Sequence, residues 1–189
     1  SAWTTPGEVY WVDEKYELTA LWIDSDLNFI ENNSDKPYYL NLWPYDVHDP
    51  FLPQPELVDK YKAITSNPYE QKFFAVIEHL DDQIGRFMNE LDNMGELDNT
   101  MIIFTSDNGP TDWPFYYEEG YYPPGSTGPF FGRKWSLYEG GIRMPFIISW
   151  LGKIPEGTVD SSTVISSVDL FPSLCKIASA TLPENTKLD

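Results

Sequence analysis

The sequence predicts an α/β fold in which a layered sheet is flanked by helices. Short runs rich in β-branched and aromatic residues alternate with longer segments that have amphipathic helical periodicity. This alternation is typical of layered folds with a largely parallel sheet. The chain has 189 residues, of which 41% are hydrophobic, and this is enough for the core of one domain or of a large part of one.

Two segments in the first half of the chain are expected to be helices. Residues 17–31 have an imperfect apolar face. Residues 69–94 give the clearest pattern, because apolar side chains recur at alternating spacings of four and three, which places them on one helix face. They are Phe73, Ile77, Leu80, Ile84, Phe87, Leu91 and Met94. On the same helix, His79 lies two positions from Ile77, about 200° around the axis, so we expect it on the solvated face without a catalytic role.

Three strands and a last helix complete the expected elements. The strands are residues 38–43, 101–105 and 144–150, and the helix is residues 168–180. Aromatic content and the bounding turn residues indicate the first strand. In the last helix Asp169 is the candidate N-cap, and Pro172 falls in the first turn.

The charge of the chain excludes some classes of function. Twelve Lys and Arg residues stand against 30 Asp and Glu residues, which gives a net charge of −18. A nucleic-acid-binding protein needs a basic surface, and an anionic membrane would repel this chain, so neither partner is expected. An anionic substrate would need local cations that overcome the field of the whole protein.

Polar residues follow the expected strands at the end where α/β sheets bind ligands. His48 comes after the first strand, Asp107 and Asn108 come directly after the second, and Lys134 precedes the third. Carboxylate and amide oxygens suit calcium or magnesium, and a lysine with a histidine suits the oxygens of a phosphate or sulfate group. Taken singly, each has a simpler interpretation, since Asp-Asn-Gly is a frequent turn and a lone histidine is usually a loop residue.

Several blocks in order resemble a known family. "FTSDNGP", then "GRKWSLYEGGIRMPFIISW", then "SSVDLFPSLCKIA" resemble the C-terminal half of the catalytic domain of type I sulfatases, in the alkaline phosphatase superfamily. "DKPYYLNLWPYDVHDPFLPQP" resembles the strand and Pro-His loop of that family. The resemblance covers about residues 16–182, and the order of the blocks is more specific than any single motif.

The resemblance implies roles for individual residues. Asp107 and Asn108 match two calcium ligands, Lys134 matches a lysine that contacts the sulfate, and His48 matches a histidine on the sulfate and leaving-group side. The segment 139–143 matches a signature that we interpret as structural support for the lysine loop. The implied reaction is hydrolysis of a sulfate ester, with calcium as cofactor and a sulfated small molecule or glycan as substrate.

The departures from the family pattern concern the nucleophile. The family uses a formylglycine made from Cys or Ser in a Cys/Ser-x-Pro-x-Arg motif, which follows an Asp-Asp pair at the end of the first strand. This chain lacks that motif, and its Asp81-Asp82 pair lies in the middle of an expected helix with no strand before it. Cys175, the single cysteine, has no Pro or Arg at the required places and is expected in the core. Asp107 and Asn108 offer only part of the six to eight oxygens that calcium takes. The hypothesis is that residues 1–189 are one partial sulfatase catalytic domain, inactive alone, with exposed apolar surface that favours self-association.

Other interpretations remain open at this point. The chain could belong to a phosphatase or phosphonate-ester hydrolase of the same superfamily, or to a non-catalytic module that binds sulfated glycans. The aromatic loop, residues 111–133, either shapes a carbohydrate subsite or simply packs against the domain. The family resemblance implies an exported protein, periplasmic or extracellular, or lysosomal in a eukaryote.

Overall fold

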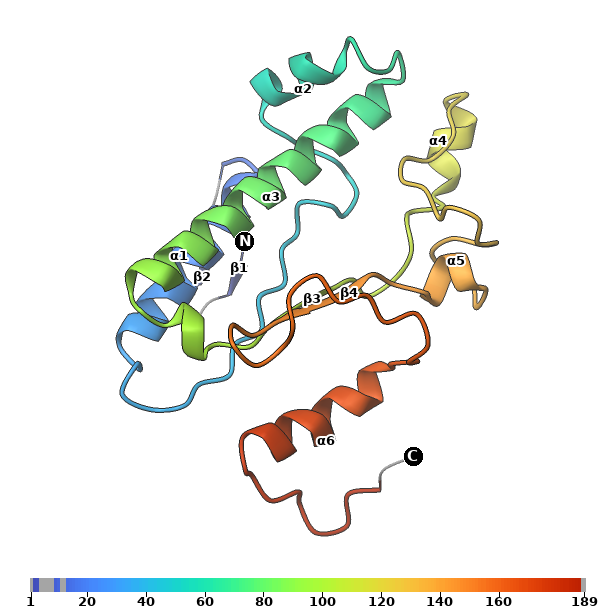
Figure 1. Ribbon diagram of the computed structural model, residues 1–189. Coiled ribbons are helices and arrows are strands. Elements are labelled where there is room, and N and C mark those ends of the chain that lie inside the picture. The colour runs from blue at the N-terminus through green and yellow to red at the C-terminus, as the bar shows by residue number, and fades with distance from the viewer. Residues whose placement is uncertain (1, 4–8, 11–12, 188–189) are drawn as a thin grey trace. The chain divides into compact units, whose positions relative to one another are not determined.

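The computed structural model describes residues 2–3, 9–10 and 13–187, and it divides into two compact units, Ser1–Ile154 and Pro155–Asp189. Figure 1 shows the elements. The first unit contains β1 (Ala2–Trp3), β2 (Val9–Tyr10), α1 (Glu17–Glu31), α2 (Pro55–Tyr61), α3 (Pro68–Asn93), the 3-10 turn η1 (Leu97–Asn99), β3 (Ile102–Thr105), α4 (Pro114–Glu118), α5 (Glu139–Ile142) and β4 (Phe146–Ser149). The second unit contains α6 (Ser167–Ile177).

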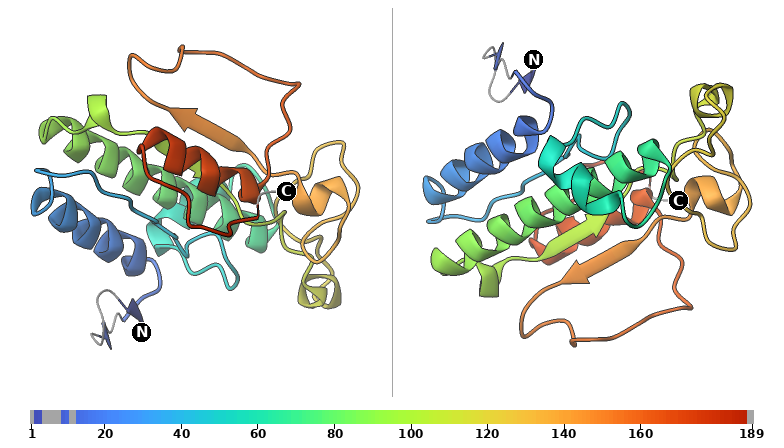
Figure 2. Two further views of the ribbon diagram at one scale, coloured as in Figure 1. Left: turned by 90° about the horizontal axis from the view of Figure 1, so that it is seen from below. Right: turned by 90° about the horizontal axis from the view of Figure 1, so that it is seen from above.

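The two expected helices of the first half are confirmed as α1 and α3. The side chain of Asn67 caps α3 by accepting a hydrogen bond from the backbone N–H of Tyr69 at 2.9 Å, and Pro68 occupies the first turn, where a missing N–H costs nothing. α3 packs against both α1 and α2, and both views of Figure 2 show α1 and α3 side by side. Ile23 and Ile30 of α1 are fully buried.

The interpretation of His79 as a surface residue is wrong. His79 is 5% exposed, whereas Ile77, which the apolar periodicity placed on the buried face, is 42% exposed. The N-terminal part of α3 is covered on the side that carries Ala75, Val76 and His79, because α1 and the segment that follows it pack there. A single apolar stripe therefore does not mark the only buried face of this helix.

The strands pair in two small antiparallel sheets. β1 pairs with β2, and β3 pairs with β4 in a register that joins Ile102 to Ser149 and Thr105 to Phe146. The expected strands 101–105 and 144–150 are thus confirmed, but the expectation of a largely parallel sheet is wrong for the described residues. Residues 38–43 form no strand; they run extended without a ladder, because β propensity produces a strand only where a partner accepts its hydrogen bonds.

An aromatic cluster joins the loop 111–133 to the rest of the first unit. Tyr116 on α4 is buried with Phe51 and Val76, and Tyr69, Phe73 and Phe115 pack around them. Other aromatic side chains of the loop, such as Trp113 and Tyr122, remain exposed. The loop therefore divides into a packed part around α4 and an exposed part.

In the second unit, α6 begins differently from the expectation. Ser166 is the N-cap and Asp169 is the third helical residue, and the two form a reciprocal capping box, which satisfies two backbone N–H groups at once. Pro172 lies inside the helix rather than in its first turn. Among the residues that the structure describes, no helix combines the length and apolar character that a membrane crossing requires.

Candidate active site

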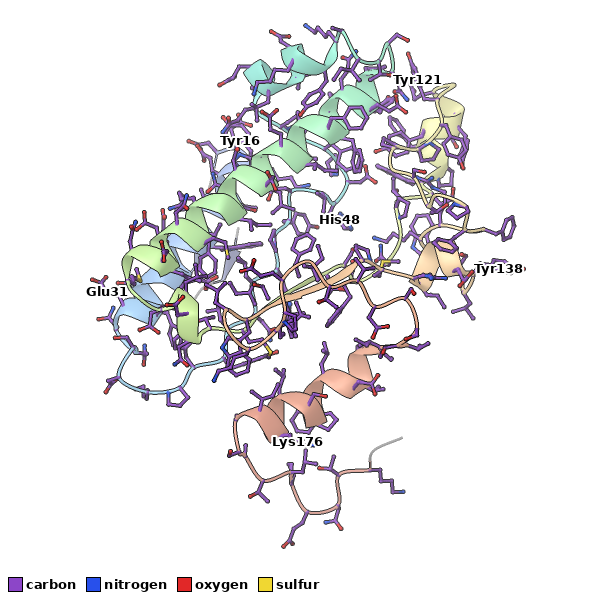
Figure 3. The ribbon with its side chains drawn as sticks, viewed as in Figure 1. Tyr16, Glu31, His48, Tyr121, Tyr138 and Lys176 are labelled. Atoms are coloured by element: carbon purple, nitrogen blue, oxygen red, sulfur yellow. The ribbon has the colours of Figure 1, made fainter. Side chains whose placement is uncertain are left out.

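The centre of the candidate site is a contact between His48 and Lys134, which are 86 positions apart in the chain. Lys134 Nζ lies 3.3 Å from His48 Nε2. Figure 3 labels His48 between α3 and the β3–β4 pair, and its backbone N–H closes a turn by donating to the carbonyl of Tyr45 at 3.3 Å. His48 is exposed and Lys134 is half-buried. The two side chains that were predicted to bind one anion are therefore neighbours in the structure.

The hydrogen bonds of His48 define its neutral tautomer. Its Nδ1 lies 2.7 Å from the carbonyl oxygen of Asp49, and because a carbonyl only accepts, Nδ1 carries the proton and donates. In the neutral ring the lone pair on Nε2 then accepts from the ammonium of Lys134. The ring is stacked on Tyr45, with centroids 5.1 Å apart and planes at 21°. One nitrogen and one face of His48 are thus occupied, and Nε2 is directed at Lys134.

Glycine residues hold the Lys134 segment against the turn after β3. The backbone N–H of Lys134 donates to the carbonyl of Pro110 at 2.9 Å, and that of Gly109 donates to Gly141 at 2.9 Å. A Cβ on Gly109 would lie 2.0 Å from the carbonyl oxygen of Gly140, far inside van der Waals contact. Only glycines permit this approach. The signature at 139–143 therefore has the supporting position that we expected for it.

Backbone strain lies next to the candidate lysine. Trp135 has φ of 72°, in the left-handed region that bulky residues rarely occupy. The turn is closed by the N–H of Ser136, which donates to the carbonyl of Arg133 at 3.1 Å. The strained residue directs the chain away immediately after Lys134, so the lysine stands at the apex of a tight turn.

Asp107 and Asn108 lie in the turn directly after β3. Asp107 is exposed and Asn108 is half-buried, and the amide of Asn108 donates to the carbonyl of Gly109 at 2.8 Å. That bond uses the nitrogen and leaves the amide oxygen available as a ligand. Within the described residues no group of three or more His, Cys, Asp and Glu side chains is arranged to hold a metal. The donor chemistry suits calcium, but this pair supplies only part of a coordination shell.

Arg133, beside the candidate lysine, is a residue that the sequence analysis did not single out. Its side chain is 7% exposed, and its N–H groups donate to four backbone carbonyls at 2.6–3.1 Å. The acceptors are Thr111, Pro123, Pro124 and Gly125. Arg133 thus fastens the start of the aromatic loop, at Thr111, and its middle, at residues 123–125, to the segment that carries Lys134. The letters "GRK" alone indicate a basic patch, and only the fold distinguishes the buried cation from the half-buried one.

The comparisons with known proteins establish the family. The sulfatase family model matches residues 1–180, and the chain belongs to the sulfatase family. It is 34% identical over 186 residues to an N-acetylgalactosamine-6-O-sulfatase of Bacteroides thetaiotaomicron, covering 90% of this chain and 34% of that protein. It is 30% identical to arylsulfatase G of Mus musculus, covering 94% of this chain and 34% of the relative.

Solved structures agree on the fold. Ps i-CgsB, crystallised with k-i-k-neocarrahexaose, superposes with a TM-score of 0.76 at 26% identity, over 90% of this chain and 36% of that one. The PsFucS1 sulfatase from Pseudoalteromonas sp. superposes with a TM-score of 0.72 at 29% identity, over 96% and 35%. The predicted family and the fold class, a layered α/β arrangement of the alkaline phosphatase type, are therefore confirmed. The chain spans about a third of the length of these relatives.

Proposed function

We propose that the protein hydrolyses sulfate esters of carbohydrates, and that residues 1–189 supply one side of its active site. The observation that carries the proposal is the contact between His48 and Lys134 at 3.3 Å, held beside the turn that contains Asp107 and Asn108. A cation and a proton-exchanging ring at contact distance suit the oxygens of a sulfuryl group. The relative from Bacteroides thetaiotaomicron is an N-acetylgalactosamine-6-O-sulfatase, and the sulfated amino sugar in its name supports the substrate class.

The proposed roles follow from the geometry. Lys134 binds a sulfate oxygen and offsets the negative charge that develops on it. His48 keeps a proton on Nδ1 through its hydrogen bond to the Asp49 carbonyl, so Nε2 is the atom that takes up a second proton and, from the protonated ring, gives it to the leaving oxygen. Bound calcium would supply further charge stabilisation, with Asp107 and Asn108 as two of its ligands. The remaining ligands and a formylglycine nucleophile are proposed to come from outside residues 1–189, so this chain alone should show no turnover.

A direct test compares three esters with one protein. The full-length protein is assayed with 4-nitrophenyl sulfate, 4-nitrophenyl phosphate and a phenylphosphonate monoester, with and without calcium. We expect hydrolysis of the sulfate, and its loss in His48→Ala and Lys134→Ala. Lys153→Ala, which removes an exposed lysine elsewhere, is the matched control and should retain activity.

The same experiment decides between the alternatives. Preference for the phosphate or phosphonate ester would indicate a hydrolase of the same superfamily with a different nucleophile. Binding of sulfated glycans without turnover of any ester would indicate a non-catalytic module. Either result would overturn the proposed activity while leaving the family assignment intact.

The exposed part of the aromatic loop is proposed as a carbohydrate subsite. Trp113 and Tyr122 leave a large part of their rings exposed, and flat rings stack on the apolar faces of sugars. The packed residues Phe115 and Tyr116 are excluded from this role by burial. Trp113→Ala in the full-length protein should raise KM for a sulfated oligosaccharide and leave kinetics with 4-nitrophenyl sulfate unchanged. Equal effects on both substrates would assign Trp113 to packing.

Exposed apolar side chains near Lys134 support the proposal that this surface is covered in the intact protein. They include Phe131, Trp135 and Leu137, with 74%, 71% and 90% of their surfaces exposed. Such a patch favours association, so the isolated 189-residue chain should self-associate. Light scattering that gives a monomer mass at micromolar concentration would contradict this expectation.

A further inference from the structure

Two residues near the start of α1 hold the segment that carries His48: one contacts it before the histidine, and the other contacts it at the histidine and after it. Lys15, just before the helix, donates from Nζ to the carbonyl of His48 and, at 2.9 Å, to that of Pro50. Thr19, one turn later, donates from its hydroxyl to the carboxylate of Asp46. The anchors therefore contact positions 46, 48 and 50, every second residue through the segment.

The Asp46 anchor is buried, so water cannot replace it. Thr19 is 1% exposed and Asp46 is 4% exposed. The other carboxylate oxygen of Asp46 lies 3.5 Å from Nε2 of His79 on α3, and that nitrogen donates to the carbonyl of Tyr16 at 2.9 Å. A buried carboxylate needs such partners because its desolvation is costly. This need accounts for a polar cluster between α1, α3 and the His48 segment.

Lys15 also acts on the ring that supports His48. Its Nζ lies 4.8 Å from the centroid of the Tyr45 ring, and the other contact of that ring is the stack with His48. Burial lowers the pKa of Lys15, and the nearby carboxylates of Asp46 and Asp49 oppose that shift. The ammonium of Lys15 therefore contacts two backbone carbonyls and the ring of Tyr45.

From this arrangement we infer that Lys15 and Thr19 are positioning residues for His48: they fix the segment 45–50 so that Nε2 of His48 meets Lys134. Neither contacts the imidazole of His48 or the side chain of Lys134; Lys15 reaches only the backbone carbonyls of His48 and Pro50 and the ring of Tyr45. The inference deepens the proposed function, and it concerns residues that contact only the segment. A displacement of about 1 Å at a reacting group can lower a rate about 100-fold, so loss of either anchor should be visible in kinetics.

The variants separate positioning from stability. Thr19→Val keeps the shape of the side chain and removes its hydroxyl, whereas Thr19→Ser retains the hydroxyl and removes only the methyl group. Ile23→Val, one turn further along α1 at a fully buried position, is the control that removes packing without a polar contact. In the full-length protein, well below every Tm, we expect Thr19→Val to lower kcat for 4-nitrophenyl sulfate about 10-fold to 100-fold with little change in KM. Thr19→Ser and Ile23→Val should stay near wild type.

Lys15 is tested independently by Lys15→Met, which keeps the length of the side chain and removes the ammonium. We expect the same loss of kcat with little change in KM. Lys15→Arg retains a donor for the two carbonyls and should recover part of the rate. Equal losses in Lys15→Met and Lys15→Arg, or a loss in KM alone, would overturn the role of Lys15.

A second measurement does not depend on activity. Diethylpyrocarbonate acylates a free imidazole lone pair, and in the wild type the lone pair of Nε2 is engaged by Lys134. Peptide mapping by mass spectrometry should therefore show slow modification of His48 in the wild type and in Ile23→Val, and modification several-fold faster in Thr19→Val and Lys15→Met. Equal rates in all four proteins would overturn the inference. If the wild type is inactive but shows this pattern of modification, the proposed activity is refuted and the positioning of His48 is supported. If kcat is unchanged in Thr19→Val and Lys15→Met, a role of the two residues in catalysis is refuted.

Discussion

Replacing Arg133 should be one of the most destabilising single changes near the site. The guanidinium donates to four backbone carbonyls at 2.6–3.1 Å, and two of these belong to Pro123 and Pro124, which are buried. In Arg133→Met the half-buried carbonyls of Thr111 and Gly125 can take water, but the two proline carbonyls lose their donors inside the protein. An unsatisfied buried acceptor costs about 1–3 kcal/mol, so we expect a loss of about 3–5 kcal/mol once the removed packing is included.

The assay is urea denaturation and thermal melting of the purified protein. For a chain of this size a loss of 1 kcal/mol lowers Tm by about 2–4 °C, so the expected decrease is on the order of 10 °C. Arg133→Lys should recover only a small part of this, because an ammonium has three donors at one point and cannot reach both Thr111 and the acceptors at residues 123–125. Lys62→Met, which removes an exposed pair with Asp59, should leave Tm unchanged. A decrease of less than about 2 °C in Arg133→Met would refute the reasoning.

Three further changes have expected outcomes. Gly140→Ala places a Cβ 2.1 Å from a backbone carbonyl oxygen and should lower both Tm and sulfatase activity, whereas Gly85→Ala, with open space around the Cβ, should raise Tm slightly. Tyr116→Phe removes the hydroxyl that donates to Asp49 and should cost about 1–3 kcal/mol in urea denaturation. Burial raises the pKa of Asp26 to about 6. The folded state therefore disfavours the ionised carboxylate, so stability falls as pH rises from the ordinary value near 4 to about 6; Asp26→Asn should raise Tm at pH 8 and not at pH 4.

Local sequence pattern was sufficient to place the two long helices and the strands β3 and β4, although these strands are half-buried or exposed rather than buried. The apolar periodicity of residues 69–94 predicted α3 to within a residue at each end, and "MIIFT" predicted β3, because both signals depend on neighbours in the sequence. Strand pairing depends on partners far away. Residues 38–43 have the composition of a strand, yet no ladder forms there. The same limit explains why the direction of the β3–β4 pair was not predicted.

The residues of the site show the same difference between local sequence signals and distant partners. His48 and Lys134 could be predicted to converge, because family motifs placed His48 in the loop after one expected strand and Lys134 in the loop before another. Thr19 and Asp46 could not, since they are joined by one hydrogen bond across 27 positions, and no local pattern marks either residue as polar and buried. His79 was misjudged for the same reason: its partners, Tyr16 and Asp46, are not on its own helix.

The charges of the site give a physical reason for a metal. The segments 45–50, 107–112 and 133–134 contain two cationic side chains and four carboxylates, and Lys15 adds a third cation against the first of these segments. These are Lys15, Arg133 and Lys134, against Asp46, Asp49, Asp107 and Asp112. The balance is slightly negative inside a chain of net charge −18, so Lys134 alone offsets little of the repulsion that a sulfate ester meets. A divalent cation on Asp107 and Asn108 would make the net charge next to the bound sulfate positive. Salt screens such a contact little, whereas it screens the repulsion from the rest of the chain over about 10 Å. Titration calorimetry should therefore show that the full-length protein binds a sulfated ligand more tightly with a calcium salt than with a sodium salt of equal ionic strength. Equal affinities would show that the metal contributes nothing to anion binding.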